Sequence, residues 1–152
     1  MAQGDVIVFE RLHLDSWKGV HNLDTDTIKV ALVGNGITPT ATTSDPRWGA
    51  GGGTNFAAQQ VSPGGNYVSG GTDISGTVFA STPFAVFDGI TNPSWTKDPA
   101  GPTGIYWAIM YNDTVAGKQA ILAIEMGTNV SNVDSHVSIT FDANGILRVS
   151  TV

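Results

Sequence analysis

The side chains that most often carry out catalysis are few in this sequence and widely separated. His13, His21 and His136 are its three histidines, and Glu10 and Glu125 are its two glutamates. Cysteine is absent, so the chain has neither a thiol nucleophile nor a Cys-based zinc site. No spacing among the histidines matches a metal-binding or triad motif. The sequence therefore predicts no catalytic residues and a protein that is not an enzyme.

Aspartates offer the one candidate for a metal site. Asp24 and Asp26 flank Thr25, and Asp15 lies nearby in the sequence. Carboxylate oxygens of this kind can bind calcium, but the spacing of an EF-hand loop is absent. Asx turns account for aspartates in such a segment without an ion, and the glycine-rich stretches lack the Gly-Lys-Ser/Thr ending of a phosphate-binding loop. We therefore expect no metal ion, nucleotide or other cofactor.

Aromatic side chains are the remaining candidates for a functional site. Trp107 lies within a long apolar segment and is expected in the core, whereas Trp48, beside glycines, and Trp95, between prolines, are expected on the surface. Exposed Trp and Tyr favour contacts with other proteins, because both are enriched at interfaces. Trp48 and Trp95 would equally suit stacking on sugar rings, which leaves a carbohydrate-binding module open. The candidate protein-contact residues are Trp17, Trp48, Phe56, Tyr67 and Trp95.

The composition predicts a weakly charged surface. Charged residues make up 13% of the 152 residues, against a usual share of roughly 25%. Dissolved proteins rely on surface charge for solubility, so a neutral surface suits a protein that is packed against neighbours. The net charge of −6 argues against nucleic acid as a partner, because such binding depends on Lys and Arg neutralising phosphates.

Targeting and membrane segments are not expected. Residues 1–5, Met-Ala-Gln-Gly-Asp, lack the basic start and the apolar stretch of a signal peptide. No window approaches the ~18 apolar residues of a membrane helix. The sequence therefore predicts synthesis in the cytoplasm and no membrane partner.

Short apolar segments separated by polar turns dominate the second half of the chain. Strands are expected over residues 105–111, 119–126, 136–141 and 146–149, with turns at Asn112–Asp113, Gly127–Asn129 and Asn144–Gly145. Short turns reverse the chain, so the pairing should be antiparallel. Trp107 and Ile109 on one face, with Ala108 and Met110 on the other, predict a central strand buried on both sides.

The first half is less regular. Residues 28–33 alternate as a strand requires, and 77–87 are β-like with an interruption at Pro83. Alternation over residues 6–17 favours a strand, with a short amphipathic helix left open. The glycine-rich residues 44–71 are expected as a long loop, either flexible or ordered against a neighbouring subunit. The predicted fold is all-β: a single antiparallel β-sandwich or jelly-roll-like domain over 1–152, with 1–22 as a candidate N-terminal arm.

Five segments, in the same order along the chain, carry a resemblance to a known family. They are residues 26–33 (Asp-Thr-Ile-Lys-Val-Ala-Leu-Val), 65–71 (Gly-Asn-Tyr-Val-Ser-Gly-Gly), 94–96 (Ser-Trp-Thr), 108–113 (Ala-Ile-Met-Tyr-Asn-Asp) and 145–148 (Gly-Ile-Leu-Arg). Together they resemble small virion structural proteins of tailed bacteriophages. Asn66 and the long stretch over residues 97–104 depart from that pattern.

The resemblance implies a capsid cement or decoration protein that stabilises the phage head by bridging neighbouring capsid subunits. The implied partners are the major capsid protein and further copies of the chain, as a homo-oligomer (dimer or trimer). The expected location is the capsid surface of the virion, after synthesis in the host cytoplasm. A tail or tail-fibre component is the alternative, beside the carbohydrate-binding module named above.

Overall fold

The computed structural model describes residues 1–81 and 83–150, and over these residues the chain is mostly β. The helices are short, and the strands lie in four separate sheets that do not close into one barrel or sandwich. The elements are β1 (Val6–Val8), α1 (Arg11–Trp17), β2 (Ile28–Val33), β3 (Pro46–Arg47), β4 (Thr54–Asn55), the 3-10 helix η1 (Phe56–Gln59), β5 (Thr72–Asp73), β6 (Gly76–Ser81), β7 (Phe84–Gly89), β8 (Ser94–Trp95), β9 (Ile105–Asn112), β10 (Ala120–Val130), β11 (Val137–Ser138) and β12 (Leu147–Ser150).

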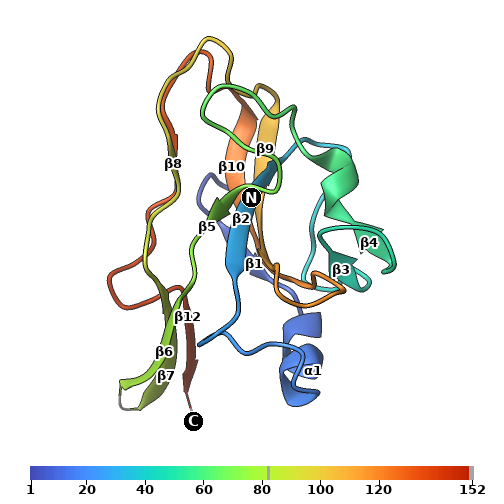
Figure 1. Cartoon of the computed structure of the whole chain (residues 1–152), viewed down its shortest axis with the longest axis vertical. Coiled ribbons are helices and arrows are strands. Elements are labelled where there is room, and N and C mark those ends of the chain that lie inside the picture. The colour runs from blue at the N-terminus through green and yellow to red at the C-terminus, as the bar shows by residue number, and fades with distance from the viewer. Residues whose placement is uncertain (82, 151–152) are drawn as a thin grey trace.

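A five-stranded antiparallel sheet forms the centre of the molecule, in the order β1-β10-β9-β2-β5 (Figure 1). Its middle strand is β9, where Ile109 pairs with Ala31 of β2 on one side and with Ala123 of β10 on the other. The two faces of β9 enter different cores: Ala108 and Met110 belong to one, and Trp107 and Ile109 to the other. The prediction of a central strand buried on both sides is therefore confirmed.

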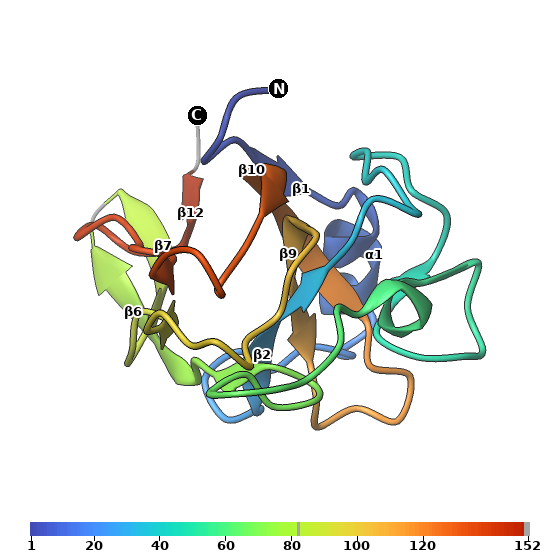
Figure 2. The same cartoon turned by 90° about the horizontal axis from the view of Figure 1, so that it is seen from above.

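Each face of the central sheet is covered by different elements, which Figure 2 shows on opposite sides of it. The antiparallel sheet β12-β7-β6 covers one face, together with the small β8–β11 pair. Phe87 of β7 and Trp95 of β8 are buried in the core beneath them. The glycine-rich segment with β3, β4 and η1 lies on the other side, where α1 is also seen (Figure 2). Leu12 of α1 nevertheless reaches the first core. The β3–β4 pair is parallel, an exception to the expected antiparallel pairing.

The glycine-rich segment packs onto the chain's own sheet. The Trp48 ring stacks on Tyr111 with ring centres 5.0 Å apart, and Phe56 stacks on Phe9 at 5.7 Å. Close backbone approach explains one glycine: Gly71 has φ +80°, and a Cβ there would collide with the Val30 carbonyl oxygen. The segment therefore forms a covering layer for the second core.

Two predicted turns differ in the structure. Gly127–Asn129 lies within β10 as an irregularity where the register with β9 shifts. Gly127 and Asn129 both take a positive φ there, of 109° and 55°, which is typical of a β-bulge. β10 therefore continues through Gly127–Asn129, although these turn-forming residues predicted that the strand ends there. The Asn144–Gly145 turn joins β11 and β12, which belong to different sheets, so it does not form a hairpin.

The N-terminal residues 6–17 combine the two alternatives that the sequence left open. Val6–Val8 form a strand that pairs with β10, and Arg11–Trp17 form a helix. Phe9 and Leu12 are buried, so the segment expected as a candidate arm packs against its own domain. Among the described residues, no helix has the length and apolar character needed to cross a membrane.

Candidate protein-contact surfaces

Four of the five candidate contact residues lie inside the protein. Trp48 and Phe56 are buried in the core beneath the glycine-rich segment, and Tyr67 and Trp95 are buried in the opposite core. The surface positions expected for Trp48 and Trp95 were therefore wrong. Glycine and proline neighbours predicted exposed loops. Trp48 instead follows β3 and Trp95 lies in β8, and both side chains are buried against the central sheet. In this conformation none of the four side chains is available to a partner.

Tyr67 shows how firmly these aromatic residues are fixed. Its ring packs edge-on against Trp95, with ring centres 5.8 Å apart. Its hydroxyl oxygen accepts a hydrogen bond of 3.0 Å from the Leu32 amide of β2. Burial raises the pKa of the Tyr67 hydroxyl to about 12, so it stays protonated at neutral pH. These contacts give Tyr67 a structural role.

Trp17 is the exception, because its side chain is 91% exposed. It is the last residue of α1, and Leu14, one turn earlier, is exposed as well. Residues three apart on a helix are neighbours, so Leu14 and Trp17 form a small exposed apolar patch. Trp17 therefore remains a candidate contact residue, and Leu14, which the sequence did not indicate, lies beside it.

A larger exposed apolar surface lies on the sheet formed by β6, β7 and β12, which we call the blade. Figure 1 shows these strands extending to the lower left of the view, away from β9 and β10. Val78 and Phe79 of β6 are exposed, and Val149 of β12 is 68% exposed. In these three strands the charged residues are Asp88 and Arg148. The Arg148 guanidinium lies 3.9 Å from the centre of the Phe84 ring, and the Asp24 carboxylate is bonded to the Val78 amide. The outer part of the blade is therefore an exposed, largely apolar surface with charged groups at its margins.

The blade contains none of the contact candidates that the sequence indicates. Val78 and Phe79 are adjacent in the sequence and lie on opposite faces of one strand. Such a pair usually indicates burial on both sides, as it does in β9. The outer part of β6 extends beyond the central sheet, and there Val78 and Phe79 are 43% and 46% exposed among the residues that the structure describes. The local sequence cannot distinguish the exposed β6 from the buried β9, because their burial depends on where each strand lies in the whole molecule.

A cluster of hydrogen-bonded polar side chains around Asn112 has a structural role. The buried Asn112 side-chain amide lies 2.6 Å from Asp26 Oδ2 and 3.2 Å from His21 Nδ1. Its own Oδ1 accepts a 3.0 Å bond from the Thr114 amide. Burial lowers the pKa of His21, while Asp15 and Asp26 act in the opposite direction. The cluster joins the turn after β9 to the segment before β2.

Asp24 and Asp26, the aspartates considered as calcium ligands, each accept a hydrogen bond from a different backbone amide. Asp24 Oδ1 accepts a hydrogen bond from the Val78 amide at 2.9 Å, while Asp26 Oδ2 accepts from the Asn22 amide at 2.8 Å. Over residues 1–81 and 83–150, no three His, Asp or Glu side chains are grouped closely enough to hold a metal ion. The two carboxylates tie backbone amides within the fold.

One hydroxyl lies near a histidine. Ser94 Oγ is 3.4 Å from His136 Nε2, and this contact is exposed. The separation is longer than the roughly 2.6–3.2 Å of a nucleophile and its base. Within the described part of the chain, no carboxylate is hydrogen-bonded to the His136 ring. The pair therefore lacks the third group that orients a catalytic histidine.

Comparison with known proteins adds no assignment. No protein family, curated protein or solved structure matches this chain.

Proposed function

We propose that this chain is a non-enzymatic structural protein of a phage virion, a capsid cement or decoration protein that binds the outer shell and bridges neighbouring capsid subunits. The observation that carries the proposal is the blade, whose apolar side chains Val78, Phe79 and Val149 are exposed on this chain. The resemblance of residues 26–33, 65–71, 94–96, 108–113 and 145–148 to phage virion proteins supports the virion as its setting. In this proposal the sheets act together as one sandwich-like unit that presents the blade.

The physical basis of binding is burial of apolar surface. Each Å² removed from water contributes about 25 cal/mol, so covering Val78, Phe79 and Val149 is worth a few kcal/mol before the costs of association. That is modest for a single contact. A shell repeats its sites, however, and repeated sites make weak contacts effective when subunits are linked. Cementing by many copies therefore requires only a small contact on each one.

The structure supports the two alternative functions, a tail component and a carbohydrate-binding module, to different degrees. A tail or tail-fibre component would use the same exposed blade, and only its partner would change. A carbohydrate-binding module needs an aromatic platform open to a sugar ring, and the two tryptophans considered for it, Trp48 and Trp95, are buried. The head and tail assignments therefore stand as the first and second candidates.

Co-sedimentation with purified empty heads tests the proposal, with purified tails as the second target. The Val78→Ser/Phe79→Ser variant changes the blade, and Val68→Ser is the matched control, because Val68 is 61% exposed on the glycine-rich segment. We expect wild-type protein and the control to sediment with heads, and the blade variant to bind at least about tenfold more weakly, a loss of 1.4 kcal/mol. Binding to tails alone would transfer the assignment to the tail. Equal binding of the blade variant would show that the blade is not the contact.

A further inference from the structure

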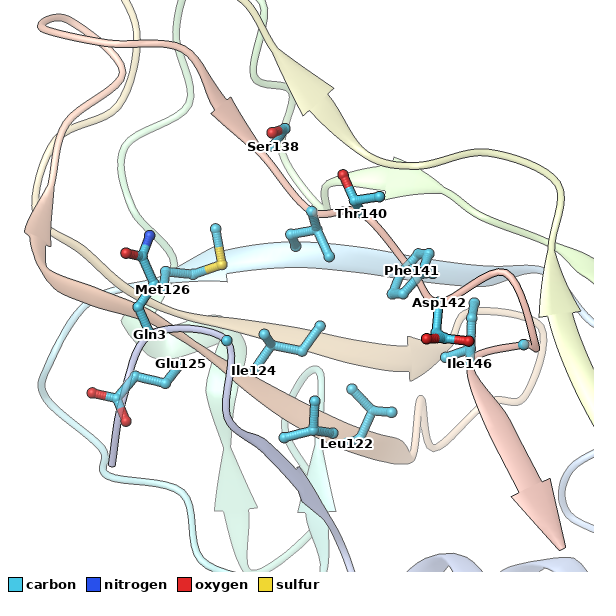
Figure 3. Close-up of a pocket in the computed structure, with 14 residues that line it drawn as sticks. Gln3, Leu122, Ile124, Glu125, Met126, Ser138, Thr140, Phe141, Asp142 and Ile146 are labelled. Carbon is cyan, nitrogen blue, oxygen red and sulfur yellow. The ribbon is translucent and has the colours of Figure 1, made fainter.

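The two layers of the molecule leave a groove open along one edge of the central sheet. On one side of it lie Leu122, Ile124 and Met126 of β10, and on the other lie residues 138–142 and Ile146 (Figure 3). Its volume is about 280 Å³, at the lower limit of the roughly 300–1,000 Å³ typical of small-molecule pockets. The groove is therefore suited to a few side chains and not to a large ligand.

The strand β1 lies at the mouth of this groove and is the edge of its sheet. Backbone bonds from Glu125 to Asp5 and from Phe9 to Ile121 show that Asp5 and Phe9 face β10. Because hydrogen bonding alternates along an antiparallel pair, the backbone groups of Val6 and Val8 point to the outer edge. Among the described residues, no strand pairs with that edge. Two N–H and two C=O groups are thus presented to an incoming chain.

The side chains of β1 face the same way as the groove. Val6 pairs with Ile124 and Val8 with Leu122, so all four side chains share one face of the sheet. Val6 lines the groove and is 55% exposed. A strand added beside β1 would therefore place alternate side chains between β1 and the groove's far wall. It would also cover apolar surface that the two layers leave open.

The charged side chains around β1 and the groove indicate which residues an added strand would carry. Asp5 and Glu10 stand at the two ends of the apolar run 6–9, and Asp142 lies at the end of the groove (Figure 3). No Lys or Arg is among the groove-lining residues. The adjacent Arg11 is paired within the chain to Asp15 at 3.0 Å and to Asp45 at 3.7 Å. Near the groove, the positive charge of the Met1 amino group is 3.9 Å from Glu125.

We propose that the outer edge of β1 and the adjoining groove bind an extended segment of another protein, with apolar residues at alternate positions and a Lys or Arg at each end. An antiparallel partner would place its two apolar residues opposite Val6 and Val8. One basic residue would lie opposite Asp5, and the other would lie near Glu10, where the chain has left β1 and begins α1. The corresponding spacing is Lys-x-apolar-x-apolar-Lys. Strand addition of this kind takes its affinity from backbone hydrogen bonds and its specificity from alternate side chains. A second copy of β1 is disfavoured, because it would bring the carboxylates of both copies together.

Fluorescence anisotropy with labelled peptides tests this site on the intact chain. The probe is Thr-Lys-Thr-Val-Thr-Val-Lys-Thr, varied to Ile, Leu and Phe at its two apolar positions. The controls are the same peptides with Glu in place of Lys, and with N-methylated residues at the two apolar positions, whose backbone nitrogens would face Val6 and Val8 and can then no longer donate to the ladder. We expect saturable binding of Lys-flanked peptides and at least about tenfold weaker binding of both controls. No saturable binding by any Lys-flanked peptide up to about 1 mM overturns the proposal.

Two variants of the protein locate the binding at β1. Val6→Pro removes one outward N–H without removing a bond to β10, and should weaken peptide binding about tenfold or more. Val6→Thr keeps that N–H and should bind within about threefold of wild type, with both unfolding midpoints checked by circular dichroism. In Asp5→Lys/Glu10→Lys, preference should reverse to Glu-flanked peptides. Unchanged binding by a folded Val6→Pro variant contradicts the site. A concentration-dependent dimer that Val6→Pro abolishes, without peptide binding, assigns the edge to a second copy instead.

Discussion

At the scale of single residues, the aromatic side chains divide by burial. Trp48 lies flat on Tyr111, with an angle of 13° between the rings, whereas Trp17 extends into solvent. The Tyr111 hydroxyl in turn donates a 2.8 Å hydrogen bond to the Gly70 carbonyl. This sequence of contacts links the glycine-rich segment to the central strand. Trp48 therefore contributes to folding, while Trp17 is available to contribute to binding.

This difference in burial predicts a large loss of stability for Trp48→Ala and almost none for Trp17→Ala. Trp48→Ala removes a large buried side chain and should lower the free energy of unfolding by about 3–5 kcal/mol. Trp17→Ala, at an exposed helix end, should change it by no more than about 0.5 kcal/mol. Urea unfolding of both variants, followed by circular dichroism, measures the difference. A Trp48→Ala protein as stable as wild type would mean that the stack is absent in solution.

The buried histidine predicts a pH dependence of stability. Burial lowers the pKa of His21 below its ordinary value of 6.5, so the unfolded chain binds that proton more readily. The free energy of unfolding should therefore fall as pH drops below about 6.5, until the folded pKa is passed. Asp113 has a lowered pKa because hydrogen bonds from Lys118 and Lys29 outweigh its burial, so its contribution is lost only in more acidic solution.

Urea unfolding at pH 7.5 and pH 5.5 checks this expectation for the wild type and for His21→Gln. A glutamine oxygen can replace the His21 nitrogen as a partner for Asn112 but does not titrate. The variant should therefore lose less stability between the two pH values than the wild type. An equal loss in both proteins would show that His21 is not the group responsible.

At the scale of elements, sequence periodicity predicted the parts whose burial is regular. The alternation over residues 28–33 and the two apolar faces of 105–111 predicted β2 and β9, because both strands are enclosed along their length. The same reasoning predicted that the strand over residues 119–126 ends at Gly127–Asn129, whereas β10 continues through these residues as a bulge. Left-handed residues occur in turns and in bulges alike, and only the partner strand distinguishes the two.

The glycine-rich segment gives the clearest prediction at this scale. Its Trp48 amide donates to the Lys118 carbonyl at 2.8 Å, and its Val61 amide donates to the Leu32 carbonyl at 3.2 Å. Native-state hydrogen exchange should therefore show Trp48 and Val61 protected in the isolated chain, while the exposed Gly51 and Gly52 exchange rapidly. Exchange at Trp48 and Val61 as fast as at Gly51 would restore the expectation of a segment that orders only on a partner.

At the scale of the whole molecule, the sequence predicted the β class and the absence of long helices, since both follow from local patterns. The arrangement of separate sheets and the exposure of the blade depend on contacts between distant segments. Asp24, for example, is bonded to Val78, fifty-four positions away. No local rule predicts such a pairing. For the same reason the sequence could name aromatic residues but could not say which of them lie on the surface.

The central claim is that this chain binds the shell of a phage head without carrying out a reaction. Electron microscopy of intact particles, labelled with a gold-conjugated antibody against this chain, tests it most directly. We predict gold over the head surface, in many copies per particle, with none on tails. Gold confined to tails or fibres, or purified particles without any label, would contradict the account.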